Sequence, residues 1–330
     1  MKRLFLMGLL GLSLALPTKA LAQQDFQARF EQAWRLVNER YWSLDVDMWQ
    51  AVRGEFEVQA LDATDEAEFY AVLETMYEQL GDDHSVYVPP ERVAEIREQY
   101  GDLPCLGVFS LGVFSYAQSR SDDVSGDVWQ QLERRETYPS GVRSGVSNQL
   151  GQAVAYIDIP DLATGGIARD VRRAVTDLSP NVVAFVVDVR GNPGGRLVEM
   201  MQAAGVFTNG FLWRTITSWT LPMPYPAIGV AATDLPLLVL TDGDVNSAAE
   251  GFAGALQANG RATVVGKTTA GNVEAVLPFC LRDGSQAWIA TGVLAPLRGA
   301  TWEGRGVVPD VEVPADRAFD AALEHLKDTL

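Results

Sequence analysis

Two units, each a buried strand, a short polar turn and a helix, constrain the fold of this chain more than any other feature. The first has an apolar run at 181–189, a glycine-rich turn at 190–195 and a helix from 197. The second has an apolar run at 235–240 and a helix from 247. Strands without alternation are typical of parallel sheets that helices cover on both faces. The sequence therefore predicts an α/β fold for the second half of the chain.

Helical spacing of apolar residues predicts a helical region before this core. The predicted helices lie at 25–42, 46–60, 65–80 and 90–100. Further core strands are predicted at 153–159, 262–265, 276–281 and 286–291, and helices at 166–178 and 315–326. Residues 106–114 are predicted to form one or two short strands, and the polar stretch 119–151 a connector with weak structure. The predicted division is 1–22, 23–100 (helical subdomain), 101–150 (connector with short strands) and 151–330 (core).

The first 22 residues have the pattern of a signal peptide. Met1–Arg3 is basic, Leu4–Leu16 is apolar and Ala20–Ala22 fits the small-x-small cleavage rule. A membrane-spanning helix needs roughly 20 apolar residues, so we expect cleavage rather than an anchor. The sequence predicts export to the periplasm or the cell exterior, with no integral membrane segment afterwards. Export would allow a Cys105–Cys280 disulfide, and two buried free thiols are an equally open alternative.

Composition excludes several kinds of partner. Lys plus Arg number 26 and Asp plus Glu 43, for a net charge of −17. So acidic a chain suits neither nucleic acid nor an anionic membrane surface. The two Cys and two His, His84 and His325, have no zinc-ligand spacing, so no metal is predicted. The glycine turn lacks the spacing of dinucleotide and Walker loops, and no cofactor is predicted. The sequence does not indicate the oligomeric state of the protein.

Both turns suit the stabilisation of negative charge. Helix N-termini present unpaired N–H groups, and glycines let a reacting group approach the backbone. An oxyanion site is therefore one interpretation of the turns. The alternative for Ser247 is purely structural, because Ser247 and Glu250 have the spacing of a helix capping box.

Four motifs in order carry a resemblance to a known family. They are Asp-Val-Arg-Gly-Asn-Pro-Gly-Gly at 188–195, Asn-Ser-Ala-Ala-Glu-Gly-Phe-Ala-Gly-Ala-Leu-Gln at 246–257, Val-Gly-Lys-Thr-Thr-Ala-Gly-Asn at 265–272 and Glu-Gly-Arg-Gly-Val-Val-Pro-Asp at 303–310. The chain resembles the C-terminal processing peptidases, or tail-specific proteases, and their tricorn-type relatives. The resemblance implies a serine peptidase with a ClpP/crotonase-like core and an N-terminal helical subdomain.

The resemblance also implies roles for particular residues. Ser247 stands where the family has its nucleophile. Gly195 and Ala248 would supply the oxyanion-hole N–H groups, supported by Gly194 in the same glycine turn.

The general base departs from the most familiar family pattern. Position 272, where many members carry a catalytic lysine, is Asn272. The resemblance to the tricorn-like branch instead implies His84 as the base, since an imidazole titrates near neutral pH. Glu303 is predicted to fix its tautomer, as the acid does in a Ser-His-Asp triad. Ser85 is predicted to assist, and Asn272 to orient a carbonyl or a substrate backbone.

Substrate selection is expected to differ as well. Typical members carry a PDZ domain between the helical part and the core, and 101–150 is too short for one. We expect the domain to be lost or reduced. The leading prediction is an exported serine endopeptidase that cleaves peptides or unfolded proteins through an acyl-enzyme on Ser247. The alternatives are a catalytically inactive peptide-binding pseudoprotease and, more weakly supported, another acyl-transfer reaction on a crotonase-like core.

Overall fold

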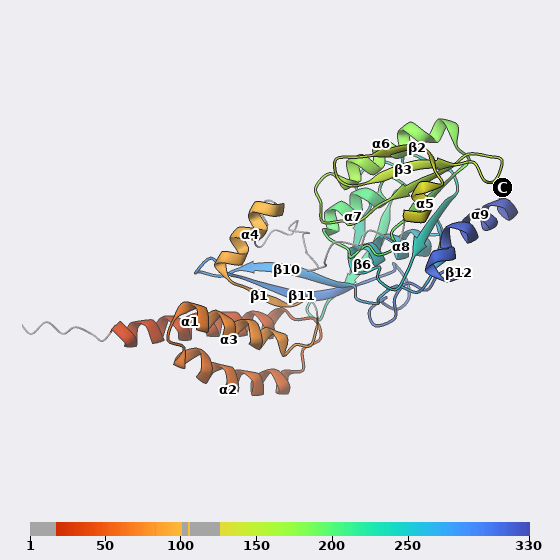
Figure 1. Ribbon diagram of the computed structural model, residues 1–330. Helices are drawn as coiled ribbons and strands as arrows, with labels where there is room; N and C mark the ends of the chain where they lie inside the picture. The colour runs from red at the N-terminus through yellow and green to blue at the C-terminus, as the bar shows by residue number, and fades with distance from the viewer. Residues whose placement is uncertain (1–17, 83, 101–104, 106–125) are drawn as a thin grey trace, which may run out of the picture.

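A computed structural model describes residues 18–82, 84–100, 105 and 126–330. The predicted strands at 106–114 and most of the predicted signal peptide lie outside these residues. The described chain forms two sheets with helices around them (Figure 1). The division into a helical first part and an α/β core agrees with the sequence prediction. Within the described residues, no helix combines the length and apolar character that crossing a membrane requires.

The core contains a seven-stranded sheet in the order β12-β9-β8-β5-β4-β3-β2. Its strands are β2 (Glu133–Thr137), β3 (Arg143–Ser147), β4 (Val154–Asp158), β5 (Ala184–Asp188), β8 (Leu237–Thr241), β9 (Thr263–Gly266) and β12 (Val311–Glu312). The five strands from β12 to β4 are parallel. Strand β3 pairs antiparallel with β4, and β2 pairs antiparallel with β3. The apolar runs therefore form the central parallel strands, as predicted.

Helices cover both faces of this sheet, which explains why its strands lack polar alternation. Phe185 and Val187 of β5 face the cluster that includes α6 (Ile167–Leu178), α7 (Leu197–Ala204) and α8 (Ala248–Ala258). Ala184 and Val186 of the same strand face α9 (Ala318–Thr329), whose apolar side chains close the other layer. Figure 1 shows α9 on the opposite side of the sheet from α6 and α7.

The polar stretch after residue 125 departs from the prediction of weak structure. It contains α5 (Gly126–Gln130) and the hairpin of β2 and β3, which extends the core sheet at its edge. All five residues of β2 are exposed, so the strand has no apolar side chains facing a core. Its sequence therefore resembles that of a polar connector. The core thus begins before residue 151.

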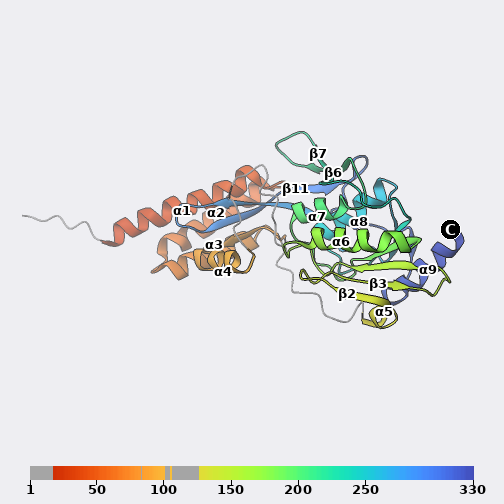
Figure 2. The same cartoon turned by 90° about the horizontal axis from the view of Figure 1, so that it is seen from above.

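A second sheet links the core to the N-terminal helices. It contains β1 (Val86–Val88), β6 (Phe211–Ile216), β7 (Met223–Pro226), β10 (Glu274–Cys280) and β11 (Gln286–Ala295). The long β10–β11 hairpin runs from the core out to the helices (Figures 1 and 2). Strand β11 pairs with β1 near one end and with β6 near the other. This hairpin therefore belongs to both parts of the molecule.

The N-terminal helices enclose the outer part of the hairpin. They are α1 (Thr18–Arg40), α2 (Val46–Asp62), α3 (Glu66–Glu78) and α4 (Pro90–Tyr100). Phe279 and Ile289 of the hairpin pack with the apolar cluster of α1, α2 and α3. Trp288 faces the opposite side, where it packs with Val93 and Ile96 of α4.

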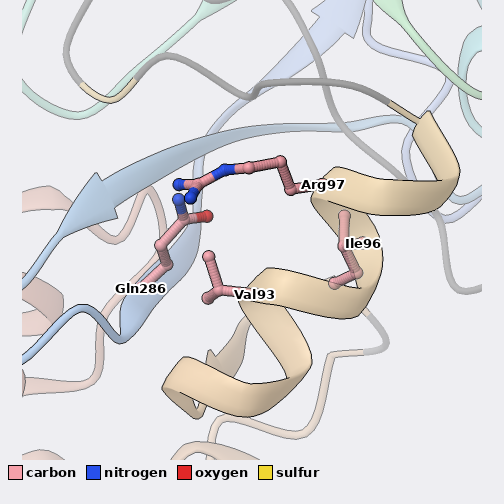
Figure 3. Close-up of a pocket in the computed structure, with 4 residues that line it drawn as sticks. All are labelled: Val93, Ile96, Arg97 and Gln286. Carbon is pink, nitrogen blue, oxygen red and sulfur yellow. The ribbon is translucent and has the colours of Figure 1, made fainter.

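Two further contacts fix the hairpin to its surroundings. Figure 3 shows Val93 and Arg97 of α4 projecting toward Gln286 of β11, which donates a hydrogen bond to Cys105 Sγ. Cys105 forms a disulfide with Cys280 at the end of β10, with a Cα–Cα distance of 5.4 Å. Of the two alternatives for the cysteines, the structure therefore contains the disulfide.

Candidate active site

The two strand–turn–helix units meet at one edge of the core sheet. Strands β5 and β8 are parallel neighbours, so the turns that follow them lie side by side. Asn246 N donates to Asn192 O at 3.0 Å, and Gly191 N donates to Asp242 Oδ1 at 3.0 Å. The position follows the rule that functional turns gather at the carboxyl ends of parallel strands.

Ser247 has a backbone conformation that capping alone does not require. It lies at φ 53° and ψ −122°, and Arg134 is the other non-glycine residue with positive φ in the described chain. N-cap residues ordinarily have extended φ and ψ, and a positive φ at a side-chain-bearing residue costs about 1–3 kcal/mol. The capping box is present as well. Such strain is typical of turns that present a nucleophile at the start of a helix.

A buried carboxylate, Glu250, holds this turn in place. It accepts hydrogen bonds from Ser247 N (3.0 Å), Thr269 Oγ1 (2.6 Å), Gly271 N (2.7 Å) and Asn272 N (2.9 Å). Burial raises its pKa, although these four bonds act in the opposite direction. Glu250 therefore fixes residues 269–272 against Ser247, a positioning role beyond the cap that the spacing indicates.

The glycine turn lies directly against the serine. A Cβ added to Gly194 would lie 2.8 Å from Ser247 Cβ and 2.9 Å from Ala248 N. Gly195 forms a parallel bridge with Leu162, in which the flanking residues, Gly194 and Arg196, make the hydrogen bonds. The Gly195 N–H consequently points away from Leu162. Within the described chain, neither Gly195 N nor Ala248 N donates to a protein acceptor.

The turn after α3 carries His84, which is 3% exposed. Asp82 Oδ1 accepts hydrogen bonds from the backbone N–H groups of His84 (2.8 Å) and Ser85. The Ser85 hydroxyl accepts a hydrogen bond from Ala290 N at 3.0 Å, so its observed role is to attach this turn to β11. Sequence and structure agree that His84 lies in a tight polar turn, and the structure adds that the imidazole is buried.

The acid that contacts the imidazole is Glu274, and not Glu303, the acid that the sequence predicts for this role. His84 Nδ1 lies 2.8 Å from Glu274 Oε2, and both side chains are almost fully buried. Burial lowers the pKa of His84, but the hydrogen bond and charge of Glu274 outweigh it, and the pKa is raised. Glu274 lies beside a register shift in β10, between Ala275 and Val276. Such a bulge redirects side chains, and the linear sequence gives no sign of it.

Glu303 lies in the same electrostatic environment but makes a different contact. Its Oε2 accepts a hydrogen bond from Val273 N at 2.8 Å. Burial raises the pKa of Glu303 to about 7, and the charge of Glu274 adds to this rise, while His84 opposes it. The Glu303 carboxyl therefore changes charge near neutral pH.

The three residues predicted to be catalytic converge on one short segment. Asn272 O accepts a hydrogen bond from Ser247 N at 3.0 Å. The next residue, Val273, contacts Glu303, and the one after it, Glu274, contacts His84. Three residues of extended chain span about 10 Å, so the three side chains approach one small region. At position 272 the observed hydrogen bonds are made by the backbone.

Three buried side-chain atoms in this region have no hydrogen-bond partner among the described residues: His84 Nε2, Asp82 Oδ2 and Asn246 Oδ1. His84 Nε2 is buried and makes no hydrogen bond to the described residues, Ser247 Oγ included. A buried polar nitrogen without a partner costs free energy and is explained in many enzymes by a catalytic role. Catalytic hydrogen bonds are often formed only when substrate is bound.

The described residues contain no group of three or more His, Cys, Asp and Glu side chains arranged to hold a metal ion. The local chemistry consists of one hydroxyl on a strained backbone, one imidazole, the carboxylates of Glu250, Glu274 and Glu303, and two backbone N–H groups without protein acceptors. These are the components of nucleophilic acyl transfer.

Known proteins match both parts of the chain. Residues 153–313 match the model of Peptidase family S41, and residues 22–78 match the Tricorn protease C1 domain. The carboxyl-terminal-processing protease of Synechocystis sp. is 30% identical over 190 residues, covering 53% of this chain and 44% of that protein. The carboxy-terminal processing protease CtpB of Bacillus subtilis is 28% identical over 215 residues, covering 61% of this chain and 42% of that protein. The chain spans less than half the length of these curated relatives.

Solved structures agree on the fold. A photosystem II D1 C-terminal processing protease superposes with a TM-score of 0.66 at 20% identity, covering 88% of this chain and 93% of that one. The tricorn protease superposes with a TM-score of 0.53 at 16% identity, covering 93% of this chain and 37% of that one. The two matched models occupy the helical part and the core in the order that the motifs predict. The chain therefore contains a Peptidase family S41 domain at residues 153–313, preceded by a Tricorn protease C1 domain at residues 22–78.

Proposed function

We propose that this protein is a serine endopeptidase in which Ser247 is the nucleophile and His84 the general base. The observation that carries the proposal is the convergence of Ser247, Glu303 and His84 on the consecutive residues 272–274. The strained backbone of Ser247 and the unpartnered Nε2 of His84 support it independently.

The proposed reaction follows from the positions of these groups. His84 Nε2 takes the proton of the Ser247 hydroxyl as its oxygen attacks the carbonyl carbon of the scissile amide. The resulting oxyanion receives hydrogen bonds from Gly195 N–H and Ala248 N–H. The imidazolium then donates its proton to the departing amine, which leaves an acyl-enzyme. His84 then deprotonates a water molecule, which attacks the ester carbonyl; the acyl group leaves as a carboxylic acid, and the imidazolium returns the proton to Ser247 Oγ.

Glu274 takes the orienting role in this proposal. Its contact with Nδ1 keeps the proton on that nitrogen and leaves Nε2 free to accept one. The raised pKa of His84 agrees with a site that stabilises the imidazolium formed during the reaction. Glu303 acts at longer range through its charge.

We propose peptides or unfolded proteins as substrates and an exported location. The carboxyl-terminal-processing relatives support a polypeptide substrate. The Cys105–Cys280 disulfide supports an oxidising compartment, because cytosolic thiols are generally kept reduced.

Labelling with a fluorophosphonate probe tests the nucleophile and the base together. We expect the native protein to be labelled, Ser247→Ala to be unlabelled and His84→Ala to react about 10²–10⁴-fold more slowly, the usual contribution of a general base. His325→Ala is the matched control and should react as the native protein does.

Two outcomes would contradict the proposal. Equal labelling of His84→Ala and the native protein would assign the base to another residue. If the folded native protein shows neither labelling nor peptide hydrolysis, the chain is a peptide-binding pseudoprotease instead.

A further inference from the structure

A groove of about 220 Å³ runs along β1, next to the turn that carries His84. Three segments line it: α3, the strand β1 with its flanking residues, and the start of α4. The lining residues are Glu74, Glu78, Ser85, Val86, Tyr87, Val88, Pro89 and Arg92. Ser85 follows His84 directly, so one end of the groove lies one residue from the proposed base.

The groove includes an open strand edge. Strand β1 is the last strand on its side of the sheet, and β11 is its one partner strand within the described chain. Successive residues of an antiparallel strand turn their N–H and C=O groups alternately toward and away from the partner. Either Tyr87, or Val86 and Val88, must therefore present backbone hydrogen-bonding groups to the groove. Such an edge can receive an extended peptide as an additional strand.

One wall of the groove is acidic. Glu74 and Glu78 are exposed, lie one helical turn apart on α3, and form no ion pair with the described residues. Partial burial and, second to it, the charge of Glu78 raise the pKa of Glu74, so a cation beside these two carboxylates would stabilise their charged forms. On the opposite wall, the positive charge of Arg92 is paired with Glu95. The charge available to a ligand is therefore negative.

We propose that this groove binds the substrate as a strand added to the edge of β1, and that Glu74 and Glu78 select segments carrying Lys or Arg. The proposal rests on the serine peptidase function and specifies its substrate class. The occupant is an extended basic peptide segment, which matches the open backbone edge, the acidic wall and the position beside His84.

Peptide binding to Ser247→Ala tests the selection without requiring turnover. We would measure fluorescence anisotropy with two ten-residue peptides that differ in two central positions, Lys in one and Glu in the other. The Lys peptide should bind more tightly. Glu74→Gln/Glu78→Gln should weaken the Lys peptide about five- to tenfold, as expected for two solvent-accessible ion pairs, and added salt should have a similar effect. The control is Glu55→Gln/Asp62→Asn, which removes the same charge from exposed positions on α2.

Peptides methylated at single backbone nitrogens test the strand addition itself. Methylation removes one N–H at a time, so a peptide bound as a strand should lose affinity at alternate positions. A uniform effect, or none, would overturn strand addition. Equal binding of the Lys and Glu peptides would overturn the selection.

These outcomes are separate from those of the labelling test. One outcome is that the native protein is labelled while the N-methylated peptides show no alternating loss of affinity and the Lys and Glu peptides bind equally. In that case the groove proposal fails and the peptidase proposal stands. If Ser247→Ala binds as expected but the native protein is not labelled, the groove proposal stands as a peptide-binding site and the catalytic proposal fails.

Discussion

The nucleophile and the proposed base are held in contrasting ways. Ser247 is built into the core sheet, where Glu250 alone receives four hydrogen bonds around it. His84 comes from the turn between α3 and β1, in the part of the molecule that the second sheet joins to the core. The buried carboxylate of the Ser247 half is thus fully hydrogen-bonded, whereas the imidazole of the other half has a buried nitrogen without a partner among the described residues.

This difference separates two requirements of the site. The geometry around Ser247 depends on local contacts within the core. The position of His84 depends on how the β10–β11 hairpin aligns the helical part with the core, because Glu274 belongs to that hairpin. Changes in the two halves should therefore have distinguishable effects.

The largest expected effect comes from Glu274, which joins the halves. Glu274→Gln retains the shape but can present an amide N–H to Nδ1, which favours the wrong tautomer of His84. We expect the labelling rate to fall about 10²–10⁴-fold, with the fold preserved by circular dichroism. If Glu303→Gln lost as much and Glu274→Gln lost nothing, the orienting acid would be Glu303, as the sequence analysis expects.

Gly194 tests the nucleophile half. In Gly194→Ala, the new Cβ would lie 2.7 Å from Asn246 O and 2.9 Å from Ala248 N, at a residue with φ +94°. The clash would displace an oxyanion donor, and losses of about 10²–10³-fold in rate are typical of such damage. The matched control is Gly243→Ala in the neighbouring turn after β8, because a Cβ there meets nothing within 4 Å. Similar rates for the two variants would show that the glycine turn does not support the reaction.

The smallest expected effect concerns pH. His84 must be neutral to act as a base, so the labelling rate should rise with pH through its raised pKa. The charge of Glu303 contributes to that raised value, so Glu303→Gln should move the rise to lower pH. If the labelling rate of Glu303→Gln rose at the same pH as that of the native protein, or at a higher pH, the charge of Glu303 would not affect the pKa of His84.

The same variant has a consequence for stability. Because the pKa of Glu303 is raised from 4.5 to about 7 in the folded state, its stabilising contribution is present below pH 4.5 and lost as pH rises through about 7. The free energy of unfolding of the native protein should therefore fall relative to that of Glu303→Gln across this interval. Denaturant titrations at several pH values measure the difference.

The sequence predicts the nucleophile half better than the base half. The apolar runs at 181–189 and 235–240 became neighbouring parallel strands, and this adjacency brings Ser247 to the glycine turn. Local pattern was sufficient because each turn follows its own strand directly. The link between His84 and Glu274 spans 190 residues and depends on a bulge in β10, which no local pattern encodes.

Other differences have equally physical reasons. Strand β2 has no apolar pattern that would predict a strand, because all its residues are exposed. The sequence does not predict the groove beside β1, because a three-residue strand has too short a pattern to be recognised. The spacing of a capping box predicts one of the four hydrogen bonds of Glu250, whereas the other three come from residues 19 to 22 positions away, which no local pattern indicates.

The order of these parts along the chain also determines when the site can exist during synthesis. His84 is made first, Ser247 much later, and Glu274 later still. On the proposed mechanism, a nascent chain that ends before residue 274 carries both reactive groups but nothing to align them. Proteolytic competence would thus arrive late in synthesis, and unfinished chains could not attack their neighbours.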